Sequence, residues 1–92
     1  MIATAQIRLY APFVHSLKEK RMVVKSLIAK THNRFNVSAA EVDEQDIHQT
    51  IVLGIAMVSE TVSFADSAMD KVISFIEQNT DAQITDIQRE FR

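Results

Sequence analysis

The most apolar stretch of the chain is IHQTIVLGIAMVS, residues 47–59. Its apolar side chains fall into two sets of opposite parity: Ile51, Leu53, Ile55 and Met57 in one, and Val52, Gly54, Ala56 and Val58 in the other. Residues of opposite parity in a strand point to opposite faces of a sheet, so both faces of this segment are apolar. A strand that is apolar on both faces is typical of the middle of a sheet. Residues 47–59 therefore predict a central strand.

Three more strands are predicted around this segment. Residues 2–10 alternate between apolar and mostly polar side chains, and Pro12 ends that strand because proline has no amide proton to donate. Residues 36–43 predict a short strand that a polar tip at residues 44–46 joins to the central one. Residues 82–91 predict a last strand at an edge, where its charges discourage aggregation. Its two isoleucines differ in parity, which predicts a β-bulge.

Two helices complete the predicted fold. Residues 16–19, Ser-Leu-Lys-Glu, form a capping-box pattern at the start of a helix that ends near Arg34. A second helix is predicted from about Thr61 to Gln78, with apolar residues at helical spacing. The resulting order, βαββαβ, predicts a ferredoxin-like α+β sandwich, with two helices on one face of a four-stranded antiparallel sheet. The first and third strands are expected to be central, in a single domain over residues 1–92.

Composition narrows the class of protein. A chain of 92 residues, 47% of them hydrophobic, suits one globular domain. The absence of cysteine excludes a disulfide scaffold, and one glycine and one proline exclude collagen-like and low-complexity chains. No apolar run approaches the ~20 residues of a membrane span, and no signal-peptide pattern opens the sequence. We therefore expect a cytoplasmic protein without a membrane partner.

The formal net charge of −2 conceals an uneven distribution. Through Phe35 the chain has seven basic residues and one acid, whereas from Asn36 onward it has three basic residues and eleven acids. Such asymmetry indicates an electrostatic partner surface. The basic residues gather on the first predicted helix, so a polyanion partner is compatible with a negative total.

The first helix therefore carries the candidate anion- or RNA-binding residues. Basic side chains on a helix face can contact phosphates, and a helix start can bind an anion through its free amides. The candidates are His15, Ser16, Lys18, Arg21, Lys25, Lys30 and Arg34. The alternative is a solvated helix face, partly paired with an acidic stripe on the second helix at Asp66, Asp70 and Glu77.

Three segments carry a family resemblance. The run HSLKEKR at residues 15–21, then NRFNVS at 33–38 and EVD at 41–43, resembles the YlxP-like family of small bacterial proteins, catalogued as a domain of unknown function. The resemblance extends over essentially the whole chain. It implies a ferredoxin-like fold, and because genes of this family often lie beside those of translation initiation and ribosome maturation, it implies a ribosomal context. It supplies no catalytic residues.

The sheet face opposite the helices is the second candidate site. A face this apolar favours an interface, and a glycine inside a strand favours a close approach by another group. The candidate dimer or ligand residues are Arg8, Tyr10, Ala40, Val42, Val52, Gly54 and Ala56. We expect self-association through this face, or a covering segment of the chain itself. With Tyr10 as its one aromatic residue, the face does not predict a platform for stacking bases.

No pattern predicts catalysis, a metal or a cofactor. The sequence lacks a cysteine nucleophile, a glycine-rich phosphate loop and a nucleophile elbow. The acidic hairpin around residues 41–48 has no EF-hand spacing. We expect a non-enzymatic, dimeric binding protein associated with RNA or the ribosome. The alternative is a structural or small-molecule-sensing homodimer with its site on the open sheet face.

Overall fold

The computed structural model describes all residues from 1 to 92. The elements, in chain order, are β1 (Ile2–Tyr10), α1 (Leu17–Arg34), β2 (Ser38–Asp43), β3 (Thr50–Val58), α2 (Val62–Gln78) and β4 (Gln83–Phe91). The predicted order βαββαβ is therefore confirmed.

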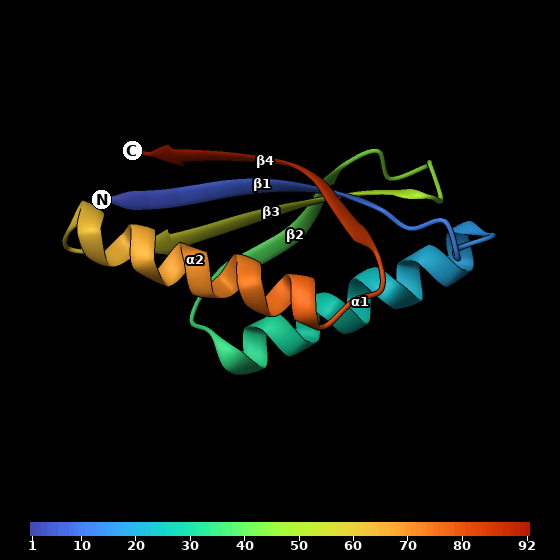
Figure 1. Cartoon of the computed structure of the whole chain (residues 1–92), viewed down its shortest axis with the longest axis horizontal. Helices are drawn as coiled ribbons and strands as arrows, with labels where there is room; N and C mark the ends of the chain where they lie inside the picture. Colours follow the sequence, from blue (N-terminus) through green and yellow to red (C-terminus); the bar gives the residue numbers. More distant parts are fainter.

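The four strands form one antiparallel sheet in the order β2-β3-β1-β4. The first and third strands are central, as predicted, and β4 is an edge. Both helices cover the same face of the sheet and leave the other face open (Figure 1). Helix α1 packs beside β2, and α2 packs over β1 and β4. Neither helix has the length and apolar character needed to cross a membrane.

The register of the central pair places one apolar set against the helices. Ile7 lies opposite Leu53, and Ala5 lies opposite Ile55. These side chains are buried with Val24 and Leu27 of α1 and with the inner side of α2 in one hydrophobic core. The sequence left open which apolar set of the central strand meets the helices. In the structure Leu53 and Ile55 lie in this core, so the other set lies on the opposite side of the sheet.

Strand β4 has the predicted bulge and is clamped to α2. Arg8 pairs with Asp86 while Leu9 pairs with Ile84, so Thr85 is the extra residue. On the helix side of β4, the Arg89 guanidinium lies 2.7 Å from an Asp66 carboxylate oxygen and 2.6 Å from one of Asp70. This fork holds the edge strand against the helix.

The loop of the β2–β3 hairpin is longer than predicted, and both strands are shorter. Strand β2 begins at Ser38 rather than Asn36, and β3 begins at Thr50 rather than Ile47. Gln49, just before β3, forms its hydrogen bonds with the loop between β1 and α1 instead of extending the strand. The Ala11 amide donates to the Gln49 carbonyl at 2.8 Å, and the Gln49 side-chain amide donates to the carbonyls of Pro12 and Val14 at 3.2 Å. These bonds join the two loops at one end of the sheet.

A buried lysine connects α1 to this hairpin. Only 1% of Lys20 is exposed, and its ammonium donates to the carbonyls of Glu44 and Ile47, each at 2.6 Å. The same ammonium lies 2.7 Å from the Glu41 carboxylate oxygen Oε2. That oxygen is buried and accepts no hydrogen bond of good geometry, so the ammonium charge is its compensation. Lys20 is therefore a structural anchor.

Replacement of Lys20 with methionine is expected to lower the free energy of unfolding by about 3 kcal/mol, because a buried carboxylate and two carbonyls lose their partner. Urea denaturation measures the change. The matched control is Lys18→Met, which removes an exposed charge two residues away and is expected to shift stability by no more than about 0.5 kcal/mol. Equal effects of the two substitutions would contradict the anchoring role.

Candidate functional site

The start of α1 has the predicted cap, with one difference. The Glu19 amide donates to the Ser16 hydroxyl at 3.1 Å, as a capping box requires. The Glu19 carboxylate, however, accepts from the amide of His15 at 3.3 Å rather than from that of Ser16. Ser16 therefore acts as the helix cap, and Glu19 places a negative charge where an anion was expected. His15 itself is exposed.

Apart from Lys20, the lysines and arginines of α1 are free of ion pairs. Five of the seven candidate binding residues are lysines or arginines; all five are exposed and none takes part in an ion pair: Lys18, Arg21, Lys25, Lys30 and Arg34. The alternative of pairing with the second helix is wrong. Asp66 and Asp70 bind Arg89 of β4 instead, and Glu77 forms no ion pair.

The free cations form two groups on the outer surface of α1. Lys18, Arg21 and Lys25 have the i, i+3, i+7 spacing of one helix stripe, which His32 continues. Lys30 and Arg34 lie four residues apart on the other flank. An 18-residue helix is about 27 Å long, so the two groups present positive charge on opposite flanks over most of that length.

The acidic hairpin lies beside the first turn of this helix. The contacts of Lys20 with the Glu44 and Ile47 carbonyls bring residues 44–47, with Glu44 and Asp46 among them, to that turn. Their carboxylates offset part of the positive charge there. The His, Asp and Glu side chains of the protein form no group of three or more that could hold a metal ion.

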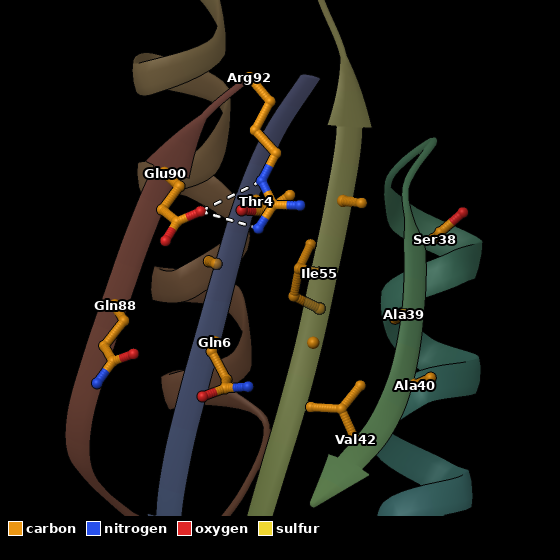
Figure 2. A pocket seen from close by; sticks show the side chains of 13 residues that line it. Thr4, Gln6, Ser38, Ala39, Ala40, Val42, Ile55, Gln88, Glu90 and Arg92 are labelled. Carbon is orange, nitrogen blue, oxygen red and sulfur yellow. Dashed lines mark hydrogen bonds and ion pairs between the residues drawn. The ribbon is translucent and has the colours of Figure 1, made fainter.

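The open sheet face has a shallow depression of about 440 Å³. Figure 2 shows its polar side, formed by Gln6 of β1, by Gln88 and Glu90 of β4 and by Arg92 just after β4, and its apolar side, formed by β2 and β3. Arg92 is paired with Glu90 at 2.9 Å. Of the predicted face residues, Ala40, Val42, Gly54 and Ala56 line the depression, whereas Arg8 and Tyr10 lie outside it.

Val42 explains the glycine at the centre of the face. Glu41 pairs with Leu53 and Asp43 pairs with Val52, so Val42 is the extra residue of a bulge in β2. A β-carbon added at Gly54 would lie 2.7 Å from the Val42 Cγ1 atom. The close approach predicted for Gly54 is thus made within the chain. The expectation that Val52 is available on this face is wrong, because only 1% of it is exposed.

A second depression of about 700 Å³ lies where α1 meets β2. It is lined by residues 32–39, among them His32, Asn33, Arg34 and Asn36. Of these four residues, the sequence predicted only Arg34 as a binding residue. The cluster of polar side chains around the helix end is visible in NRFNVS, but the recess that they share depends on the turn geometry.

A Gly54→Ala substitution is expected to cost about 1–3 kcal/mol of stability, because its methyl group overlaps Val42. Combining it with Val42→Ala removes the overlap and is expected to restore part of the loss. The coupling energy from this double-mutant cycle, measured by urea denaturation, is the readout. Additive effects of the two substitutions would show that the contact does not dictate glycine at this position.

Comparisons with known proteins agree with this fold. A de novo designed protein with a ferredoxin fold, solved by solution NMR, superposes with a TM-score of 0.66 at 17% identity, covering 100% of this chain and 87% of that chain. At this identity the likeness shows the fold alone, and the predicted ferredoxin-like class is confirmed.

Sequence relatives confirm the predicted resemblance. The "Uncharacterized protein YlxP" of Bacillus subtilis (strain 168) is 40% identical over 62 residues, which cover 67% of each chain. Residues 2–89 match the family described as "Protein of unknown function (DUF503)". Because this match takes in both helices and nearly the whole sheet, the chain belongs to the DUF503 family.

Proposed function

We propose that this protein is a non-enzymatic binding protein of the cytoplasm that contacts RNA or the ribosome through the outer surface of α1. The observation that carries the proposal is the set of five exposed basic side chains on one helix without an ion pair. Every ion pair of the protein uses other cations. The free charges therefore remain available to a polyanion.

The energetics favour this use of the helix. Like charges at i, i+3 and i+4 on a helix repel one another, so the stripe at Lys18, Arg21 and Lys25 costs the isolated protein some stability. Phosphates that bind these side chains remove the repulsion and release condensed counterions, which drives association at low salt. The negative net charge does not oppose local binding, because the Debye length at physiological salt is only about 8 Å.

Neutralising the stripe with Arg21→Gln and Lys25→Gln together is expected to weaken binding to purified ribosomes. Binding is measured by cosedimentation over a salt series. The plot of log affinity against log salt concentration has a negative slope, and its magnitude is expected to decrease by about 1 for each phosphate that the variant no longer neutralises. Both residues are exposed, so the fold is expected to be unchanged.

The matched control is Arg92→Glu, which lowers the net charge by the same two units at the end of the chain remote from α1. This variant is expected to bind as the wild type does. Binding that is independent of salt, or an equal loss of affinity in both variants, would contradict a contact through α1.

The open sheet face favours a second candidate function, a homodimer that senses a small molecule. Its apolar half ends in Val58, of which 83% is exposed, and Ile2 pairs with Val58 on the same face. Exposed apolar surface of this kind favours an interface, since burial stabilises it by roughly 25 cal/mol per Å². A second copy stacked on this face would enclose the depression beside Ala56 as a ligand site.

An Ala56→Lys substitution is expected to dissociate such a dimer, because it places a charge in the apolar half of the face. Sedimentation velocity at micromolar concentration measures the state of association. Ser67→Lys, on the exposed side of α2, is the control and should leave a dimer intact. A wild-type monomer, or an Ala56→Lys dimer, would contradict association through this face.

A further inference from the structure

The end of α1 that meets β2 has the more favourable charge for a polyanion. At the first turn, the Glu19 carboxylate accepts a hydrogen bond from the His15 amide. The bond from Lys20 to the Glu44 carbonyl places this acidic residue beside the same turn. From Lys20 to Ala40, in contrast, the chain contains no acidic residue. Positive charge is therefore least opposed over the second half of the helix and the turn that follows.

Charge alone does not identify a site there. Lys30 and Arg34 also suit the negative end of the helix dipole, which cations stabilise without any ligand. The second observation is the depression of about 700 Å³ at the α1–β2 turn. No acidic residue lines it, and the side chains of His32, Asn33, Arg34 and Asn36 make no hydrogen bond within the protein.

The recess is an open depression lined by polar and apolar side chains. The two asparagines each offer an amide donor and a carbonyl acceptor, and Arg34 offers a planar guanidinium. Phe35 and Val37 are half-buried and line the same recess. The Phe35 ring packs edge-on against Phe75 of α2, with centroids 5.4 Å apart, so its position is fixed. Ligand sites combine apolar surface with a few polar groups, and this depression offers both.

We propose that this recess holds an unpaired base of single-stranded RNA, whose neighbouring phosphates contact Lys30 and Arg34. The inference rests on the proposed function and deepens it by naming the form of RNA. Proteins recognise single-stranded bases by stacking and by hydrogen bonds to the base edges. In a duplex the Watson–Crick edges are paired and the base faces are stacked, so an unpaired base offers Asn33 and Asn36 more hydrogen-bonding groups than a paired one.

The test compares a single-stranded RNA of roughly ten nucleotides with a blunt duplex of the same sequence, by fluorescence anisotropy. The single strand is expected to bind roughly tenfold more tightly than the duplex. Combining Asn33→Ala with Asn36→Ala should reduce single-strand affinity roughly tenfold, the loss expected when two hydrogen bonds to a base edge are removed. It should leave the salt dependence unchanged, since neither residue is charged.

The matched control is Gln45→Ala with Gln78→Ala, which removes two exposed amides outside the recess and should bind as the wild type does. Equal affinity for single strand and duplex, or full affinity of the asparagine double variant, would overturn the base site. In those outcomes salt-dependent binding through α1 still stands. Failure of both RNAs to bind at low salt would overturn the base site together with direct RNA binding.

Discussion

The buried ammonium of Lys20 determines how α1 sits on the sheet. It joins the first turn of the helix to two carbonyls and one carboxylate of the β2–β3 hairpin, at 2.6–2.7 Å. Turning the helix to bring its other cations against the protein would break all three contacts and leave a buried carboxylate without compensation. One inward lysine thus keeps the remaining basic side chains of α1 on the outside, where a partner can reach them.

The choice of ion-pair partners also explains why positive and negative charge lie on separate parts of the surface. The acids that are held in ion pairs between elements are Glu41, Asp66 and Asp70, and their partners are Lys20 and Arg89. Neither partner is one of the exposed cations of α1. Lys20 and Arg89 are therefore the two cations that form ion pairs between elements. The exposed cations of α1 stay unpaired, and most acidic residues lie in the rest of the chain. That separation is the physical basis for the proposed contact with RNA.

The elements could be predicted from sequence because they depend on local patterns. Which face of the central strand meets the helices could not, because that strand is apolar on both faces. The two-sided apolar run ending at Val58 predicts a central strand, Ser16 and Thr61 occupy helix N-caps, and the parity break between Ile84 and Ile87 predicts the bulge in β4. The family resemblance predicted the same fold, and the match over residues 2–89 confirms the family.

The contacts that were not predicted depend on residues far apart in the chain. Lys20 has the same local pattern as its exposed neighbours, and only a hairpin 24 residues later makes it an anchor. The alternative in which Asp66 pairs with α1 is not realised, because Arg89 on a strand 23 residues later binds it. Gly54 is explained by Val42, which no spacing rule places over it. The recess at the α1–β2 turn likewise requires the turn geometry.

The most direct test is to map the backbone amides whose NMR shifts change when single-stranded RNA is added to ¹⁵N-labelled protein. We expect changes along the outer surface of α1 that are largest from Lys30 to Ser38, with α2 and the open sheet face unaffected. Changes centred on the open face around Ala56, or no changes at low salt, would contradict a contact with RNA through α1.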